Sequence, residues 1–151
     1  MPESLEVSAA TRVRAAPERV WEVAMDWSRQ GEWIPATRVR GGTGVGAQVT
    51  ARTAVGPVGF TDTMVITEWD PPRRCVVQHT GKVVRGRGIF EVIPHGELTE
   101  FRWTEVVELP MPAVLQRGRA LRVTQVAGQR AVVPLARRSL QYALARFARL
   151  V

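Results

Sequence analysis

The side chains of this chain that could carry chemistry are two carboxylates and an imidazole, Asp62, His79 and Glu105. Each lies in a run of residues with the pattern of a β-strand. Carboxylates and imidazoles are the groups that most often move protons in enzymes or orient a ligand's hydroxyl group. A buried carboxylate or imidazole costs free energy unless it is paired or meets a ligand. We therefore expect either cofactor-free acid–base chemistry or hydrogen bonding to a ligand inside an apolar interior.

Strand alternation predicts which way these side chains point, because successive residues of a strand face opposite sides of a sheet. Within residues 100–109, Glu105 shares its face with Trp103 and other apolar residues, so this face is expected to be the inner one. The same rule places His79 and Asp62 inward on two other strands. The candidates for the lining of an interior cavity are Phe60, Asp62, Met64, Ile66, Val77, His79, Phe90, Val92, Trp103, Glu105 and Phe147.

Each polar candidate also has a purely structural interpretation. Glu105 can be a buried carboxylate that is hydrogen-bonded within the protein, and His79 can be a core histidine with both nitrogens satisfied. Asp62 can cap a turn after Gly59. At this level the structural and the functional interpretations both remain open.

An amphipathic helix is predicted over residues 132–151, because its apolar residues fall within one arc of a helical wheel. Pro134 then falls near the first turn, where proline is tolerated. Residues 113–130 are predicted to be a helical lead-in that is broken before the main helix. We expect Arg138 and Arg149 in solvent and four apolar residues buried, namely Leu140, Ala143, Phe147 and Leu150.

A first helix is predicted to begin at Pro17, because proline is preorganised for the first helical position. Apolar residues follow at helical spacing as far as Trp27, so the helix is expected to end near residues 28–31. Ala16 is a weak N-cap residue. A second short helical turn is expected over residues 32–34.

The region between the two helices is predicted to consist mainly of antiparallel strands joined by turns rich in glycine and proline. The predicted class is α+β, with a curved antiparallel sheet of six or seven strands around the long C-terminal helix. Including the strand that precedes the first helix, the predicted strands are 5–14, 37–40, 48–55, 60–69, 75–80, 86–93 and 100–109.

Length and composition favour one soluble domain over residues 1–151. A chain of 151 residues with 45% hydrophobic and 23% charged residues can bury a sizeable core. Its single cysteine, Cys75, excludes an internal disulfide and is typical of a reducing compartment. The sequence contains neither a signal-peptide pattern nor an apolar run long enough to span a bilayer, so a cytoplasmic location is expected.

Positive charge is concentrated at the C-terminal end. Residues 113–151 contain eight arginines and no acidic residue, whereas residues 1–112 contain 13 basic and 14 acidic residues. A solvated arginine face is one interpretation, and peripheral contact with an anionic membrane or an acidic partner is another. Nucleic-acid binding is not favoured, since the basic stretch lacks interleaved exposed aromatics and any groove-reading motif.

Several other chemistries lack their sequence signatures. His79, His95 and Cys75 do not have the spacing of a zinc site. The chain contains no Gly-x-Ser-x-Gly nucleophile elbow and no dinucleotide-binding glycine motif between a strand and a helix. No metal and no cofactor is therefore expected.

Two motifs resemble those of the SRPBCC superfamily, the START-like or helix-grip group that includes polyketide cyclases and dehydrases. They are Ala15-Ala16-Pro17-Glu18-Arg19-Val20-Trp21 at the first helix and Glu68-Trp69-Asp70-Pro71-Pro72-Arg73-Arg74 between strands, together with the long terminal helix. The resemblance covers nearly the whole chain. It implies a strongly bent sheet that grips the C-terminal helix, with a deep apolar pocket between them. Because the superfamily shares no catalytic signature, the resemblance assigns no catalytic residue.

Members of that superfamily bind lipids, sterols, polyketides or other hydrophobic molecules, and some catalyse cyclisation or dehydration. The leading expectation is therefore a protein that binds a small hydrophobic ligand in a cavity between the sheet and the C-terminal helix. A cofactor-free cyclase or dehydrase-like enzyme remains an alternative, as does an interaction protein that uses the basic helix. The sequence indicates neither the ligand nor the oligomeric state.

Overall fold

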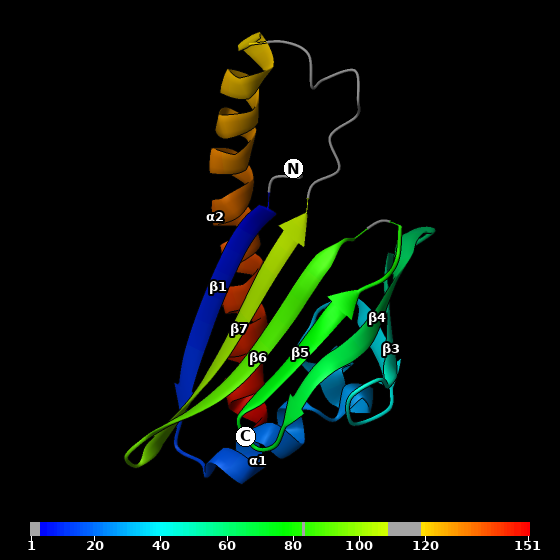
Figure 1. The fold of residues 1–151 in the computed structure, drawn as a ribbon. Helices are drawn as coiled ribbons and strands as arrows, with labels where there is room; N and C mark the ends of the chain where they lie inside the picture. The colour runs from blue at the N-terminus through cyan, green and yellow to red at the C-terminus, as the bar shows by residue number, and fades with distance from the viewer. Residues whose placement is uncertain (1–3, 83, 109–118) are drawn as a thin grey trace.

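A seven-stranded antiparallel sheet and one long helix dominate the structure, a computed structural model that describes residues 4–82, 84–108 and 119–151. Their arrangement is shown in Figure 1. In chain order the elements are β1 (Ser4–Val13), α1 (Pro17–Ala24), the 3-10 helix η1 (Trp27–Glu32), β2 (Thr37–Gly41), β3 (Gln48–Val55), β4 (Val58–Asp70), β5 (Arg74–His79), β6 (Gly86–His95), β7 (Leu98–Glu108) and α2 (Arg119–Leu150). The predicted α+β class and the seven strands are confirmed.

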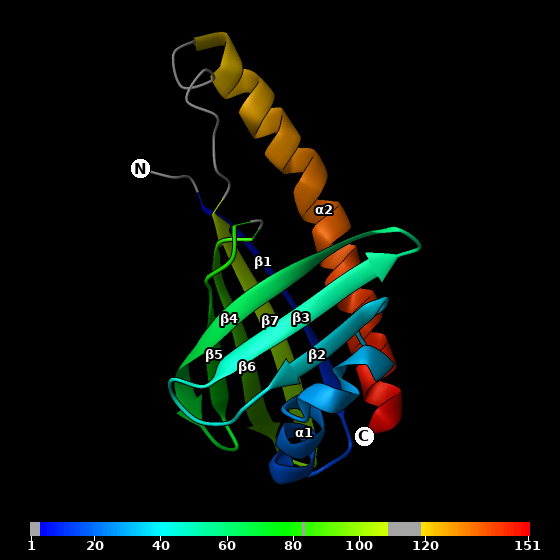
Figure 2. The same cartoon turned by 90° about the vertical axis from the view of Figure 1, so that its right-hand side faces the viewer.

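The sheet is strongly curved, and its strand order is β1-β7-β6-β5-β4-β3-β2. Figure 2 shows β2, β3 and β4 curling away from β1 and β7, while α2 runs along the concave side. The helix packs directly on β1. β1 and β2 are the two edge strands of the sheet. The concave face between them, which α2 covers beside β1, carries the polar candidates Asp62, His79 and Glu105.

The first helix is shorter than predicted. It begins at Pro17 as expected and has no side-chain N-cap bond, but it ends at Ala24 rather than near residue 28. Trp27 instead begins η1, because the Asp26 carboxylate accepts hydrogen bonds from the backbone N–H and the hydroxyl of Ser28. This local cap starts a separate 3-10 helix. The short turn expected at residues 32–34 is the end of η1 and its C-cap, Trp33.

The C-terminal helix is longer than predicted. It is continuous from Arg119 to Leu150, so Pro134 lies inside it rather than in its first turn, and residues 119–130 belong to the same helix. Residues 113–118 of the predicted lead-in lie outside the described residues. As predicted, Leu140, Ala143 and Phe147 are buried, Leu150 is partly buried, and Arg138 and Arg149 are exposed.

An aromatic cluster joins the helix to the sheet. Trp33 makes edge-on contacts with Phe101, Trp103 and Phe147, with ring centroids 5.3 to 5.8 Å apart. Phe90 stacks on Phe101 and Trp103. Aromatic pairs of this kind add free energy beyond their buried area. The indole N–H of Trp33 is buried and has no hydrogen-bond partner among the described residues.

The convex face of the sheet carries a ladder of ion pairs, which we call the convex ladder (Glu68, Arg74 and Glu91). Arg74 on β5 lies 3.1 Å from Glu68 on β4 and 3.1 Å from Glu91 on β6. The Glu68 side chain is exposed to solvent, and those of Arg74 and Glu91 are partly exposed. Exposed pairs of this kind contribute little to stability, because water competes for both charges.

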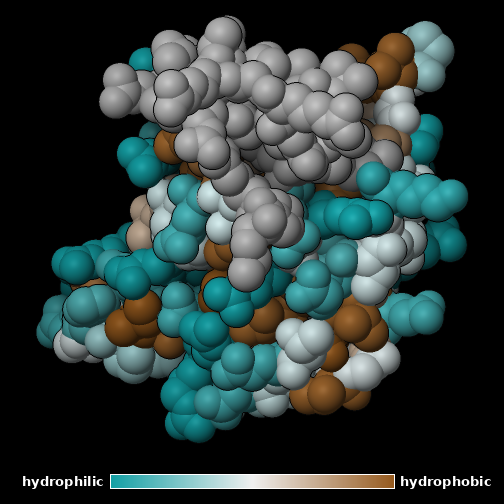
Figure 3. All heavy atoms as spheres, turned by 45° about the horizontal axis from the view of Figure 1, so that its top comes forward, coloured by the Kyte–Doolittle hydropathy of each residue, from teal (hydrophilic) through white to brown (hydrophobic). Residues whose placement is uncertain are grey.

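The exposed large apolar side chains of the described residues fall in two groups. In the coloured part of the face that Figure 3 shows, hydrophobic residues are scattered among hydrophilic ones. One group lies on β3, on β4 and in the turn before β3, and the other lies on α2: Val45, Val55, Val58 and Phe60, then Val132, Leu135 and Tyr142. Within the described ranges no helix has the length and apolar character needed to cross a bilayer.

Candidate functional site

Asp62, His79 and Glu105 meet on the concave face of the sheet and form what we call the polar triad. Nδ1 of His79 lies 2.9 Å from a carboxylate oxygen of Asp62, and Nε2 lies 3.2 Å from Oε2 of Glu105. The imidazole is 4% exposed, whereas the Asp62 and Glu105 side chains are 13% and 20% exposed. Three strands therefore bring together groups that are 17 and 26 residues apart, and the carboxylates remain partly accessible.

The charge of the triad follows from the environment of His79. Burial disfavours the imidazolium, but hydrogen bonds to Asp62 and Glu105 and the negative charge of both carboxylates outweigh it, which raises the pKa of His79 to about 9. At neutral pH the ring is therefore protonated and donates a hydrogen bond from each nitrogen. The imidazolium acts as a clamp between two carboxylates, and it has no lone pair left with which to accept a proton.

A glycine on β6 allows Glu105 to reach His79. Gly88 lies opposite Glu105 on one side and opposite Val77 on the other, so β6 separates the two strands that carry the pair. A Cβ atom at position 88 would lie 3.1 Å from both Oε1 of Glu105 and Cγ2 of Val77. A side chain at position 88 would crowd this carboxylate, so glycine there gives Glu105 room beside His79.

A pocket of about 650 Å³ lies between α2 and strands β2, β3 and β7. Apart from Arg138 and four hydroxyl-bearing residues, its lining is apolar: Ile34, Pro35, Thr37, Thr53, Trp103, Leu135, Arg138, Ser139, Leu140, Tyr142 and Ala143. Trp103 connects this pocket, which we call the helix pocket, to the triad. Its indole N–H donates a 2.6 Å hydrogen bond to Oε1 of Glu105.

The remaining cavity candidates occupy two kinds of position. Met64 is partly buried against the core, and the others except Phe60 belong to the core itself: Ile66, Val77, Phe90, Val92 and Phe147. Phe60 lies near the start of β4 and is 37% exposed. None of these residues lines the helix pocket. Their assignment to a ligand cavity therefore stays a prediction, and only Trp103 among the apolar candidates has pocket surface there.

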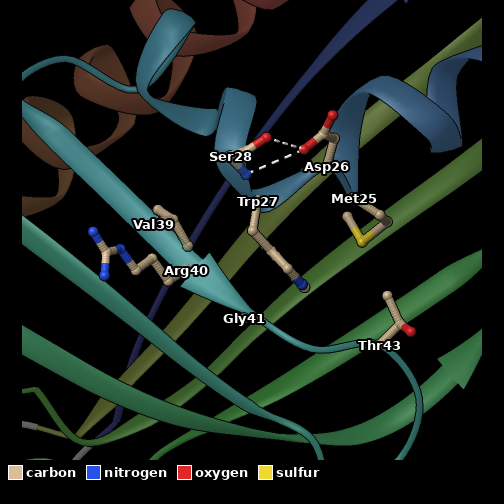
Figure 4. A pocket seen from close by; sticks show the side chains of 8 residues that line it. All are labelled: Met25, Asp26, Trp27, Ser28, Val39, Arg40, Gly41 and Thr43. Carbon is tan, nitrogen blue, oxygen red and sulfur yellow. Dashed lines mark hydrogen bonds between the residues drawn. The ribbon is translucent and has the colours of Figure 1, made fainter.

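A second pocket, of about 470 Å³, lies where α1 and η1 meet β2 (Figure 4). Its polar groups already satisfy one another, since Asp26 accepts from Ser28 as the cap of η1. The indole N–H of Trp27 likewise donates to the carbonyl of Gly42 at 2.8 Å. These local bonds account for Asp26, Trp27 and Ser28 without a ligand.

The described residues contain no group of three or more histidine, cysteine or acidic side chains arranged to hold a metal ion. Cys75 is buried on β5, and burial raises the pKa of its thiol to about 12. A thiol of that kind stays protonated and unreactive at neutral pH. Within the polar triad, the partly exposed groups are the carboxylates of Asp62 and Glu105.

Sequence reasoning missed most of the helix pocket. Leu135, Arg138 and Tyr142 line it from α2, although they fall outside the apolar arc on which the predicted packing face was based. One signal was present in the sequence, because Leu135 and Tyr142 are large apolar residues on an otherwise basic face. The lining from β2 and β3 depends on how far the sheet curls, which strand alternation does not give.

Comparison with known families gives one match over nearly the whole chain. A family described as "Polyketide cyclase / dehydrase and lipid transport" matches residues 4–151. No curated protein sequence matches the chain.

Several solved structures share the fold at low sequence identity. The Zhui aromatase/cyclase from Streptomyces sp. R1128 is 18% identical with a TM-score of 0.72, over 97% of this chain and 92% of that one. The protein TTHA0849 from Thermus thermophilus is 20% identical with a TM-score of 0.65, over 94% and 96% of the two chains. The di-domain StfQ of the steffimycin biosynthetic pathway is 15% identical with a TM-score of 0.67, over 97% of this chain and 51% of StfQ. These likenesses establish the helix-grip fold.

Proposed function

Since the chain belongs to the polyketide cyclase/dehydrase and lipid transport family, we propose that it binds a small hydrophobic molecule between the concave face of the sheet and α2. The ligand class is a lipid or a polyketide-like compound. The observation that carries this proposal is the helix pocket and its direct connection to the polar triad through Trp103.

The size and chemistry of the helix pocket suit such a ligand. Its volume of about 650 Å³ lies within the range of roughly 300 to 1,000 Å³ that is usual for small-molecule sites. Burial of apolar ligand surface against residues such as Leu140 and Trp103 would supply the main favourable free energy. Leu135 and Tyr142 are exposed, and a ligand in the pocket would partly cover them.

The triad gives the ligand a preferred polar contact. His79 uses both nitrogens within the protein, so the available groups are the remaining lone pairs of Asp62 and Glu105. Carboxylate oxygens only accept hydrogen bonds. A ligand that reaches past Trp103 therefore benefits from a hydroxyl or enol group that donates to Glu105.

The test is a pocket-filling substitution, Ser139→Trp, assayed with the neutral dye Nile red. Ser139 is exposed and lines the helix pocket, so a tryptophan there occupies the site with little disturbance of the core. We expect saturable fluorescence enhancement with the wild-type protein and at least ten-fold weaker dye binding by Ser139→Trp. Mass spectrometry of small molecules extracted from the purified protein identifies the natural ligand class.

Ala145→Trp is the matched control, because Ala145 is an exposed α2 residue that does not line the pocket. It is expected to bind the dye as the wild type does. Equal binding by all three proteins, or no saturable binding by any, contradicts the proposal. Cellular function that survives Ser139→Trp would instead support an interaction protein that acts through its basic helix.

The triad also favours a second candidate function, cofactor-free acid–base catalysis of the cyclase or dehydrase type. The Glu105 carboxylate could take a proton from a carbon beside a ligand carbonyl, while the electron pair of that C–H bond moves to the carbonyl oxygen as an enolate. Return of the proton, or of a deuteron from the solvent, completes the exchange. The observation behind this candidate is a partly exposed carboxylate held by two donors, His79 and Trp103.

Glu105→Gln separates catalysis and ligand contact from a structural role. A catalytic Glu105 predicts that a bound 1,3-diketone exchanges its acidic C–H with deuterium faster on the wild type than on Glu105→Gln, as measured by NMR. A contact role predicts altered ligand affinity with a nearly unchanged melting temperature. Lower stability with unchanged binding and exchange by the folded fraction would show that Glu105 is only structural.

A further inference from the structure

We propose that the ligand of the helix pocket is an amphipathic acid whose anionic group pairs with Arg138. This inference rests on the proposed binding function and adds the charge and the orientation of the ligand. Arg138 is the one charged residue among the described residues that line the pocket. A carboxylate is the simplest anionic group, since the planar guanidinium donates two parallel hydrogen bonds to it.

The surroundings of Arg138 make it available for such a pair. It is exposed on α2 between Leu135 and Tyr142, which are 64% and 58% exposed and line the same pocket. No acidic side chain of the described residues forms an ion pair with it. The result is a cation beside uncovered apolar surface, and a molecule with an acidic head and an apolar body complements both.

Another arginine of α2 is already engaged elsewhere. Arg146 donates two hydrogen bonds to the backbone carbonyl of Glu32, at 2.9 and 3.3 Å, and its guanidinium lies 5.9 Å from the Tyr142 ring centroid. These contacts tie α2 to the end of η1 and leave Tyr142 as one wall of the pocket. Arg146 therefore has a structural role, and Arg138 is the candidate anion partner at the pocket itself.

The polar triad fixes the orientation of the ligand. With His79 protonated, two carboxylates and one imidazolium leave a net negative charge beside Trp103. An acidic head would be repelled there and attracted at Arg138. The apolar body of the ligand then runs from Arg138 toward Trp103, and any hydroxyl at its far end faces Glu105.

The experiment compares dansylaminoundecanoic acid with its methyl ester, which has the same apolar body without the charge. Wild-type protein is expected to bind the acid more tightly than the ester, and added salt should weaken only the binding of the acid. Arg138→Gln is expected to weaken acid binding about three- to ten-fold and to leave ester binding unchanged. The expected effect is moderate because Arg138 is exposed to solvent.

Arg137→Gln is the matched control, since it removes the same charge from the neighbouring residue, which does not line the pocket. It is expected to keep the preference for the acid. Ser139→Trp is expected to abolish binding of both probes, which ties the effect to this pocket.

Three results overturn the inference alone, and a fourth also overturns the proposed function. Equal wild-type affinity for acid and ester would show that the pocket is an apolar binding site without a preference for an anionic group. Equal losses in Arg137→Gln and Arg138→Gln mean a diffuse effect of net charge. Reduced binding of Arg138→Gln to anionic lipid vesicles, with unchanged binding of the free acid, assigns Arg138 to membrane contact instead. If neither probe binds the wild type, the proposed binding function fails together with the inference.

Discussion

The two faces of the sheet both carry charged groups that bridge three strands, but the environments of these groups differ. On the convex face, Arg74 pairs with Glu68 and Glu91 where all three side chains meet solvent. On the concave face, His79 lies between Asp62 and Glu105 and is almost completely buried. Water can solvate the charges of the convex ladder. The charges of the polar triad are largely shielded from water, so they are stabilised mainly by one another.

The comparison shows how to separate a functional polar group from a structural one in this fold. The convex ladder needs no explanation beyond neighbouring strands with opposite charges at adjacent positions. The polar triad carries a desolvation cost that an apolar side chain at the same positions would avoid. The carboxylates of the triad are 13% and 20% exposed, which is consistent with the ligand contact that we propose.

The largest expected effect tests whether the concave face is a packed interior at all. Phe147→Ala removes a fully buried ring that contacts Trp33 and Phe101, and it should lower the free energy of unfolding by roughly 3 to 5 kcal/mol. Urea denaturation measures the change. Ala145→Gly, at an exposed site of the same helix, provides the comparison at about 1 kcal/mol. A loss below about 1 kcal/mol for Phe147→Ala would mean that α2 does not pack as described.

A smaller effect tests the concave charges through pH. Because the pKa of His79 is raised to about 9, its ion pairs stabilise the fold fully below the unfolded pKa near 6.5 and are lost as pH rises through about 9. The difference in stability between about pH 6.5 and about pH 9.5 should be on the order of 2 to 3 kcal/mol. Denaturant melts at each pH, compared with His79→Gln as a background, isolate this contribution.

His95 provides the control for that titration, because it is the second histidine of the chain and is exposed at the end of β6. His95→Gln should retain the full pH dependence. The clamp between the carboxylates is wrong if His79→Gln and the wild type lose the same stability over that pH range.

The smallest effect concerns the convex ladder. Arg74→Gln removes both of its ion pairs but leaves two carboxylates that water can reach, so the loss of stability should stay below about 1 kcal/mol. The loss should shrink further in about 1 M salt. Thermal unfolding at low and high salt measures both. A loss above about 2 kcal/mol would show that the two faces do not differ as their exposures indicate.

The fold was predictable wherever a simple period decides the structure. Alternation along β7 and β5 correctly pointed Glu105 and His79 toward the interior, because a strand has only two faces. The helical period likewise found the buried side of α2. Periodicity did not predict where a local hydrogen bond interrupts a helix. Trp27 fits the period of α1, but the Asp26 cap interrupts that helix, and Pro134 is accommodated inside α2 instead of starting it.

The candidate site was predictable in its polar members and not in its shape. Asp62, His79 and Glu105 were proposed separately, and only the register across β4, β5, β6 and β7 shows that they touch. Gly88 has no side chain that a sequence pattern could reveal. The lack of a side chain at this position nevertheless gives the Glu105 carboxylate its room. Phe60 has the same strand parity as Asp62, yet its exposure depends on how close it lies to the strand end.

Trp103 also gives the protein an optical readout of its own site. Its ring borders the helix pocket while its N–H is bound to Glu105, so a ligand that displaces water there should move the indole emission to shorter wavelengths. Of the other four tryptophans, three are buried and Trp69 is partly buried against Trp21, so their emission should change less. Occupancy of the pocket can then be followed by intrinsic fluorescence, without a dye and in the unmodified chain.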